Sequence, residues 1–172
     1  MIPEVEELTE GEPEAAVVEN ARRKALAGMK VAASEGALVL GVDTEVVLNG
    51  RLLGKAADAA EARQRLEALS GRTHEVLSGV VVMAPGADER SGLARSNVSF
   101  RELSPGHLEA YLASGEWRDR AGAYAVQGLG SSLVEEVRGD LSNVIGLPVN
   151  LLFELLPDFR GPAGDSRSGS RF

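Results

Sequence analysis

The sequence predicts an α/β fold, because a segment with helical periodicity is followed by short apolar runs typical of buried strands. Residues 14–33 carry apolar side chains at helical spacing, and the apolar run 38–42 follows closely. The dipeptide Asn49-Gly50 is a strong hairpin signal, since both central residues of a type I′ turn need positive φ. A helix, a buried strand and a hairpin are therefore expected in succession.

The later elements follow from capping and strand patterns. The pattern Asp58-Ala-Ala-Glu61 is typical of a capping box and opens a helix through Leu69. Thr73 to Met83 has the composition of a strand, and its apolar end indicates a central place in the sheet. The further elements expected are a strand over 93–103, a helix from Ser104 to residue 112 or 113, a strand over 133–137 and a helix over 149–156.

The two ends of the chain differ in composition from this middle part. Residues 1–13 are acidic and interrupted by proline and glycine, and alone they would predict a solvated terminus. Residues 157–172 are rich in Gly, Ser, Arg and Asp without periodicity, which predicts a disordered tail. We therefore expect one domain over 1–156 and a tail over 157–172.

Composition excludes several classes of function. Cysteine is absent, which excludes disulfides and thiolate metal sites. His74 and His107 are far apart in the sequence, so a zinc site is not expected. A formal net charge of −8 argues against a nucleic-acid-binding surface. No apolar run approaches transmembrane length and the first residues are unlike a signal peptide, so we expect a cytoplasmic protein that does not bind membranes.

Asp43 and Thr44 are the first candidate site residues. They follow the apolar run 38–42, where we expect one strand to end and the hairpin to begin, and ligands bind at such strand ends in open α/β sheets. Spacing alone leaves two interpretations of Asp43 open: a turn residue that accepts a backbone N–H, or a catalytic or metal-binding carboxylate. Lys55, just after a glycine, is either a phosphate-binding residue or simply exposed. The glycine-rich segment 115–130 favours a ligand-facing loop over a linker.

Five sequence blocks occur in a characteristic order. They are Asp43-Thr-Glu-Val-Val-Leu-Asn-Gly50, Leu53-Gly-Lys55, Leu69-Ser-Gly-Arg72-Thr-His-Glu-Val76, Asp119-Arg-Ala-Gly-Ala-Tyr-Ala-Val-Gln127-Gly and Gly139-Asp-Leu-Ser-Asn-Val-Ile-Gly-Leu-Pro148. From about Val5 to Leu156, this order resembles the Maf family of nucleoside triphosphate pyrophosphatases, and in particular its branch acting on dTTP and UTP.

The resemblance implies a two-lobed α/β fold around a long mixed β-sheet, with flanking helices and a central cleft. It implies hydrolysis of a nucleoside triphosphate, here dTTP, UTP and modified pyrimidine nucleotides, to the monophosphate and pyrophosphate with a divalent cation, Mg²⁺ or Mn²⁺. It also implies a homodimer. The alternative function is that of a nucleotide-binding regulator without turnover, linked to septum formation in cell division.

The resemblance also implies catalytic roles for four charged residues. Asp43 matches the family's proton acceptor, and attack of water on the α-phosphorus needs either a base or a metal-bound hydroxide. Glu6 matches a charged active-site residue, and Asp43 and Glu6 are expected to share the metal ion. Lys55 and Arg120 are expected to stabilise the negative charge that develops on the pyrophosphate leaving group.

Base and substrate recognition are implied for three further positions. Thr44 and Gln127 match residues that help choose the base, and the Gln127 amide offers one acceptor and two donors for a pyrimidine edge. Arg72 is expected to bind substrate.

Three departures from the family pattern affect these expectations. The family opens with a Ser-x-x-Arg segment that grips phosphates, and this sequence begins after that segment, so either the start lies upstream or the grip has been lost. Arg120 replaces the family's lysine, and a guanidinium fork is not equivalent to an ammonium point charge. Ala56 replaces a proline, which is expected to loosen the loop after Lys55.

Overall fold

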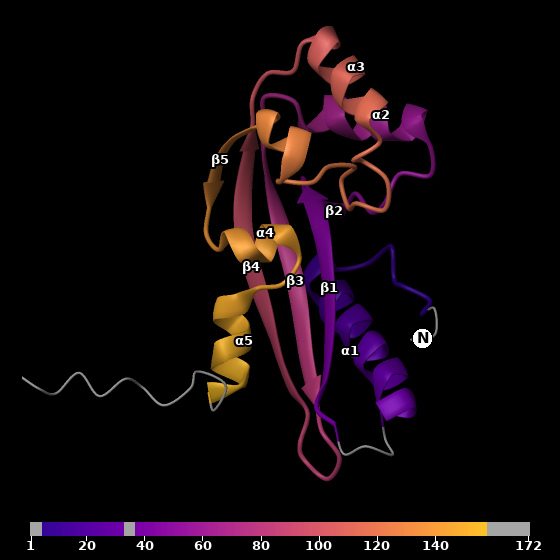
Figure 1. The fold of residues 1–172 in the computed structure, drawn as a ribbon, viewed down its shortest axis with the longest axis vertical. Helices are drawn as coiled ribbons and strands as arrows, with labels where there is room; N and C mark the ends of the chain where they lie inside the picture. The colour runs from indigo at the N-terminus through magenta and orange to yellow at the C-terminus, as the bar shows by residue number, and fades with distance from the viewer. Residues whose placement is uncertain (1–4, 33–36, 158–172) are drawn as a thin grey trace, which may run out of the picture.

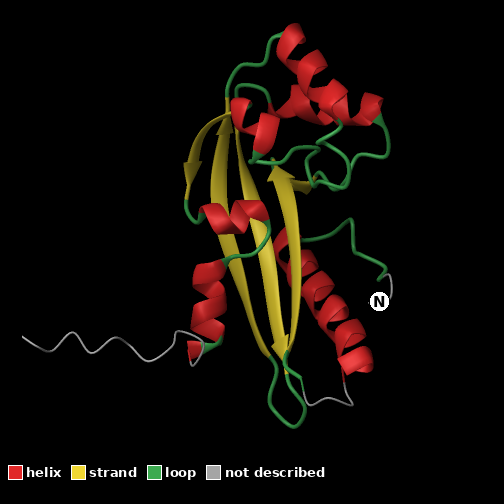
Figure 2. Cartoon of the chain, viewed as in Figure 1, coloured by secondary structure: helices red, strands yellow, loops and turns green. Residues whose placement is uncertain are grey.

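The computed structural model describes residues 5–32 and 37–157. These form a five-stranded sheet with helices on both faces (Figure 1, Figure 2), so the α/β class is as predicted. The elements in chain order are α1 (Pro13–Ala32), β1 (Val39–Leu48), β2 (Arg51–Leu52), α2 (Ala59–Leu69), β3 (Thr73–Met83), β4 (Arg90–Phe100), α3 (Pro105–Ser114), the 3₁₀ helix η1 (Gly128–Ser132), β5 (Val134–Arg138), α4 (Leu141–Ile145) and α5 (Val149–Leu155).

The strands lie in the order β2-β1-β3-β4-β5, and every pairing among the described residues is antiparallel. The sheet is thus not mixed in this part of the chain. The Asn49-Gly50 turn and the loop 84–89 return the chain directly beside the preceding strand in the pairs β1–β2 and β3–β4, whereas β1–β3 and β4–β5 are joined by longer connections that contain helices. Asn49 and Gly50 have φ of 52° and 75°, as the predicted turn requires. Since β2 pairs with only the last two residues of β1, the edge of β1 over 39–46 has no strand partner among the described residues.

β1 is one continuous strand, whereas the sequence pattern placed a strand end at Asp43. Asp43 lies in the middle of β1 and pairs with Gly79 of β3. The expectation was wrong because a buried carboxylate can lie inside a strand when its side chain meets polar partners on a neighbouring element. Those partners come from α1.

α1 packs across one face of β1 and β3, which we call the α1 face (Figure 1). A Cβ atom at Gly41 would lie 2.1 Å from the carbonyl oxygen of Ala21, and one at Gly79 would lie 2.3 Å from that of Val17. The two strand glycines therefore permit the helix backbone to approach the sheet closely. The buried contacts in this layer are Val17 with Val47 and Leu77, and Ala21 and Ala25 with Val81.

The opposite face carries α4 and α5, and we call it the α4 face (Figure 1). Asn143 of α4 is fully buried, and its Nδ2 donates to the Val76 carbonyl and to Ser96 Oγ, both at 3.0 Å. These bonds fasten α4 to β3 and β4. At one end of the sheet, α2, α3 and η1 surround a core that contains Leu66 and Phe100, which is consistent with the predicted two lobes.

Most predicted element bounds agree with the structure. Asp58 caps α2 as predicted, since its Oδ1 accepts from the Glu61 backbone N–H at 2.9 Å, but the Glu61 carboxylate accepts from the Ala57 N–H at 2.7 Å and not from that of Asp58. β4 begins at Arg90, before the predicted residue 93, and neither η1 nor α4 was predicted. The tail predicted from residue 157 lies, apart from Pro157, outside the described residues.

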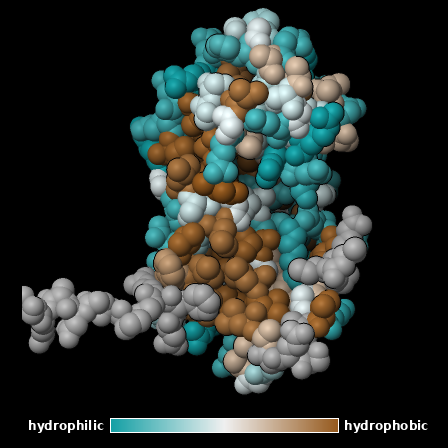
Figure 3. Space-filling view, in the orientation of Figure 1, coloured by the Kyte–Doolittle hydropathy of each residue, from teal (hydrophilic) through white to brown (hydrophobic). Residues whose placement is uncertain are grey.

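An apolar surface lies on the α4 face beside the free edge of β1. Its exposed side chains are Leu38, Leu40, Ile145, Leu147 and Val149. Figure 3 shows it as a continuous apolar area over the lower half of this face. Within residues 5–32 and 37–157, no helix combines the length and the apolar character needed to cross a membrane.

Candidate active site

The candidate site lies on both sides of β1, because successive side chains of a strand point to opposite faces. Asp43 and Glu45 point to the α1 face, where charged residues surround them. Thr44 and Val46 point to the α4 face, where they line a pocket.

Asp43 lies at the centre of a charged group on the α1 face. Its side chain is 4% exposed and accepts hydrogen bonds from Lys24 Nζ at 2.5 Å and Asn20 Nδ2 at 3.0 Å. Lys24 Nζ also lies 2.6 Å from one Glu7 oxygen, and Lys55 Nζ lies 3.7 Å from the other. We define the lysine–carboxylate cluster as Glu7, Lys24, Asp43, Glu45 and Lys55.

The cluster shifts the pKa values of its members in different directions. Burial alone would lower the pKa of Lys24, but its hydrogen bonds to Asp43 and Glu7 outweigh burial and raise it. Burial alone would raise the pKa of Glu7, but Lys24 and Lys55 lower it on balance. Burial, with the charges of Asp43 and Glu7, raises the pKa of Glu45 to about 7. Glu45 Oε2 is buried without a hydrogen-bond partner among the described residues.

Asn20 anchors the segment that brings Glu7 to the cluster. The Leu8 backbone N–H donates to Asn20 Oδ1 at 2.7 Å, and the Leu8 carbonyl accepts from Asn20 Nδ2 at 3.1 Å. The same Nδ2 donates to Asp43, so one fully buried amide connects this segment, α1 and β1.

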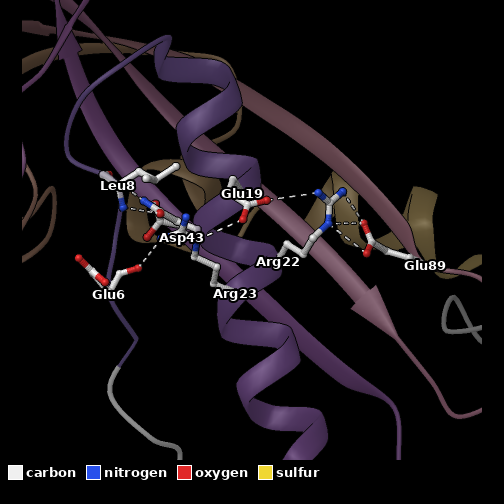
Figure 4. A network of polar contacts seen from close by, with 8 residues as sticks. Glu6, Leu8, Glu19, Arg22, Arg23, Asp43 and Glu89 are labelled. Atoms are coloured by element: carbon white, nitrogen blue, oxygen red, sulfur yellow. Dashed lines mark hydrogen bonds and ion pairs between the residues drawn. The ribbon is translucent and has the colours of Figure 1, made fainter.

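The structure places Glu7, and not the predicted Glu6, in the cluster. The Glu6 side chain is exposed, and its backbone carbonyl accepts from Arg23 Nη1 at 3.0 Å. Figure 4 shows the Glu6 carboxylate pointing away from Asp43. Adjacent side chains of an extended segment point to opposite sides, so only one of two consecutive glutamates can face Lys24.

Residues on the opposite face of β1 line a pocket of about 260 Å³. Thr44 faces this pocket, and its Oγ1 lies 2.7 Å from Ser78 Oγ on the neighbouring strand. Arg120 and Gln127, both exposed, come from the loop between α3 and η1, and residues 144–146 contribute the wall from α4. The pocket thus combines apolar walls with a hydroxyl, an amide and a guanidinium.

Lys55 connects the pocket to the lysine–carboxylate cluster. It lines the pocket and pairs with Ala121 in an isolated β-bridge, while its Nζ lies near Glu7. The Gly122 backbone N–H donates to the Gly54 carbonyl at 2.8 Å, which holds the two loops together. Because the edge of β1 over 39–46 is free in the described part of the chain, no strand separates the pocket from Asp43 at this edge.

Arg72 lies outside both parts of the site. It is exposed in the turn between α2 and β3, where its backbone N–H donates to the Leu69 carbonyl at 3.0 Å and its carbonyl accepts from the Phe100 N–H at 2.9 Å. Of the predicted residues, the structure brings together five around β1: Asp43, Thr44, Lys55, Arg120 and Gln127.

Two site residues on α1 were missed from the sequence. Asn20 and Lys24 are four positions apart and therefore lie on one side of the helix. Asn20 is fully buried next to Ala21, although it is polar. A polar pair at this spacing beside the apolar face is the signal that could have identified both.

Buried aromatic residues support the pocket wall. Tyr124 lines the pocket, and its hydroxyl lies 2.8 Å from His74 Nε2. The rings of His74 and Phe100 meet the Tyr124 ring edge-on, with centroid distances of 5.4 and 4.7 Å. Burial lowers the pKa of His74 from 6.5 to about 4, so the imidazole is neutral at pH 7.

His74 is expected to make stability depend on pH. Its pKa is lower in the folded than in the unfolded state, so its contribution is present above pH 6.5 and is lost as the pH falls toward 4. Between pH 7.5 and pH 5, unfolding should become easier by about 2 kcal/mol through this residue. Urea unfolding of wild type and His74→Gln at both pH values measures this difference. The exposed His107→Gln is the matched control. A difference between the two pH values that is as large in His74→Gln as in wild type would contradict the prediction.

The donor set around Asp43 suits a divalent cation that arrives with a phosphate ligand. Among the described residues, no group of three or more His, Asp or Glu side chains is arranged to hold a metal ion. Mg²⁺ is commonly held by one or two carboxylates together with substrate phosphates and water. Asp43 and Glu7, whose carboxylates both contact Lys24, supply two such carboxylates.

Comparison with known proteins gives consistent matches. The model of the family described as Maf-like protein matches residues 1–159. A dTTP/UTP pyrophosphatase of Moorella thermoacetica is 52% identical over 124 residues, which cover 72% of this chain and 64% of that protein. One of Pyrococcus furiosus is 45% identical over 118 residues, covering 69% and 62%. One of Anaeromyxobacter sp. is 47% identical over 150 residues, covering 85% and 71%.

The matches cover different shares of the relatives and of this chain. The chain spans less than two thirds of the length of the Moorella and Pyrococcus proteins. The family model, in contrast, covers nearly all of the chain, including both parts of the site around β1. The chain therefore belongs to the family of Maf-like proteins.

Proposed function

We propose that this protein hydrolyses nucleoside triphosphates to the monophosphate and pyrophosphate, with a preference for dTTP, UTP and modified pyrimidine nucleotides. The observation that carries the proposal is that Lys55, beside the free edge of β1, both lines the pocket and belongs to the lysine–carboxylate cluster, with its Nζ 3.7 Å from Glu7. The names of the relatives, dTTP/UTP pyrophosphatases, support the choice of reaction and substrate.

The pocket on the α4 face suits the base. Its lining combines apolar side chains, such as Val46 and Val144, with several polar groups, and a mixed lining of this kind can both contact a planar base and orient it. Thr44, oriented by Ser78, and Gln127 supply the hydrogen-bonding groups for a pyrimidine edge.

The triphosphate would pass over the edge of β1 toward Asp43. Lys55 lies at this crossing and Arg120 lines the pocket beside it, so both are placed to bind phosphate oxygens. Their positive charge would stabilise the leaving pyrophosphate, which gains negative charge in the transition state.

Asp43 would accept the proton of the attacking water, so that this proton ends on the carboxylate. As the bond between the water oxygen and the α-phosphorus forms, the bond from the α-phosphorus to the oxygen that bridges to the β-phosphorus would break, and pyrophosphate would leave with that oxygen. Lys24 holds the carboxylate in place through one oxygen, and Asn20 through the other. Glu7 would take the role that the family resemblance implied for Glu6, and Asp43 and Glu7 would hold Mg²⁺ or Mn²⁺ with the phosphates. When bound, the cation would stabilise the negative charge on the phosphate oxygens. A cytoplasmic location and a homodimer stay predictions.

The test is pyrophosphate release from dTTP, UTP, CTP, ATP and GTP with Mg²⁺. Release should be fastest with dTTP or UTP and should fall at least about 100-fold in Asp43→Asn, which removes the proton acceptor. The exposed Asp88→Asn is the matched control and should retain activity. A folded chain that binds UTP without releasing pyrophosphate would contradict the proposal and favour the non-catalytic nucleotide-binding regulator.

A further inference from the structure

The turn that carries Gln127 is held from outside the pocket by Glu116. This residue follows α3, and its two carboxylate oxygens accept hydrogen bonds from successive backbone N–H groups, Oε1 from Leu129 and Oε2 from Gly130, both at 3.1 Å. Both donors belong to η1, the short helix that begins directly after Gln127. Both oxygens of one side chain are therefore committed to this turn.

The backbone wraps tightly around the Glu116 carboxylate. Gly128 has φ of 64°, and a Cβ atom there would lie 2.7 Å from Glu116 Oε1. A Cβ atom at Gly130 would lie 1.9 Å from the Ala125 carbonyl oxygen. Glycine is required at both positions for the turn to close, so the path of the chain on either side of Gln127 is narrowly defined.

A second side chain holds the other end of the same turn. The Tyr111 hydroxyl accepts a hydrogen bond from the Ala125 backbone N–H at 3.1 Å. Tyr111 is 2% exposed, and burial raises its pKa, so the hydroxyl stays neutral. Neither Tyr111 nor Glu116 lines the pocket, yet between them they fix the backbone before and after Gln127.

Gln127 itself remains available to a ligand. Its side chain is exposed, lines the pocket and forms no capping hydrogen bond with η1. An amide can distinguish base edges only when its donors and acceptor are held at hydrogen-bonding distance and angle. The position of the Gln127 backbone therefore decides how well the amide can do so.

We propose that Glu116 is a positioning residue for base recognition, which holds the Gln127 turn so that the Gln127 amide faces the base of a pyrimidine nucleotide. The inference rests on the proposed function, since the pocket is taken to bind the base. Glu116 touches neither the substrate nor the reacting atoms, and its whole effect passes through Gln127.

The experiment is a double-mutant cycle with UTP as the probe. Glu116→Gln replaces one acceptor by an NH₂ group that cannot accept from the backbone N–H, with little change in shape. It should raise KM about tenfold and change kcat less than about twofold. In the Gln127→Ala background the same substitution should change KM less than about twofold, because the group it positions is absent. Glu109→Gln, an exposed residue of α3 with the same change of charge, is the matched control.

Two further measurements separate this inference from the proposed function. If wild type releases no pyrophosphate, the proposed function fails, and the cycle is measured as the Kd for UTP by calorimetry. Amide exchange at Leu129 and Gly130 should speed up in Glu116→Gln whatever the activity. Unchanged exchange, an unchanged KM or Kd in Glu116→Gln, equal increases in both backgrounds, or a chain that binds no UTP would each overturn the inference.

Discussion

Lys24→Met is expected to destabilise the protein by about 3 kcal/mol and to stop pyrophosphate release. Lys24 Nζ lies between Asp43 and Glu7, at 2.5 and 2.6 Å. Without the ammonium group, the buried Asp43 carboxylate would keep only its bond from Asn20 and would face the charge of Glu7. Removing one partner of a buried ion pair leaves an uncompensated charge, which costs more than the pair itself contributes. Urea unfolding at pH 7.5 and the release assay measure both effects.

Two further variants test this explanation of Lys24. The exposed Lys30→Met, on the same helix, should change stability by less than about 0.5 kcal/mol. Adding Asp43→Asn to Lys24→Met should recover part of the lost stability, because a neutral amide no longer needs the ammonium. Wild-type stability in Lys24→Met, or no recovery in the double variant, would show that the cluster is not stabilised in this way.

Gly41→Ala is expected to destabilise the protein by about 3 kcal/mol and to reduce activity as well. The added methyl group would lie 2.1 Å from the Ala21 carbonyl oxygen and 2.7 Å from the Ala25 nitrogen, both of them backbone atoms of α1. The helix would have to move away from β1, and Lys24 would move with it. Thermal unfolding and the release assay measure the two effects.

Gly106→Ala is the matched control for Gly41→Ala. Gly106 lies in the first turn of α3, where an added Cβ atom would meet nothing closer than Ser104 Oγ at 3.9 Å. Alanine is favoured over glycine in a helix by about 0.5 to 1 kcal/mol, so this variant should be as stable as wild type or slightly more stable. Equal stability of Gly41→Ala and wild type would contradict the close packing of α1 on β1.

Features that depend on a few neighbouring residues were predicted well. The Asn49-Gly50 turn, the Asp58 cap of α2 and the bounds of β3 all agree with the structure. In each case a short stretch of chain contains the interactions that specify the conformation, so the pattern can be read without knowing what packs against it.

The assembly of the site depended on contacts between distant segments. Asp43 was identified as a candidate, but its place inside β1 follows from Asn20 and Lys24, which α1 presents to the strand. The choice between Glu6 and Glu7 likewise depends on which side of an extended segment faces α1.

The sequence alone was therefore sufficient for the α/β class, for the family resemblance and for four residues that line the pocket, Thr44, Lys55, Arg120 and Gln127. It could not show that the side chains of Asp43 and Thr44 point to opposite faces of the sheet. Nor could it show that the two parts of the site to which they belong are joined at the free edge of β1. Nor could it show that Glu116 holds the Gln127 turn. The physical reason is that these relations are contacts across the sheet or between loops, and their geometry arises only when helices pack on particular faces.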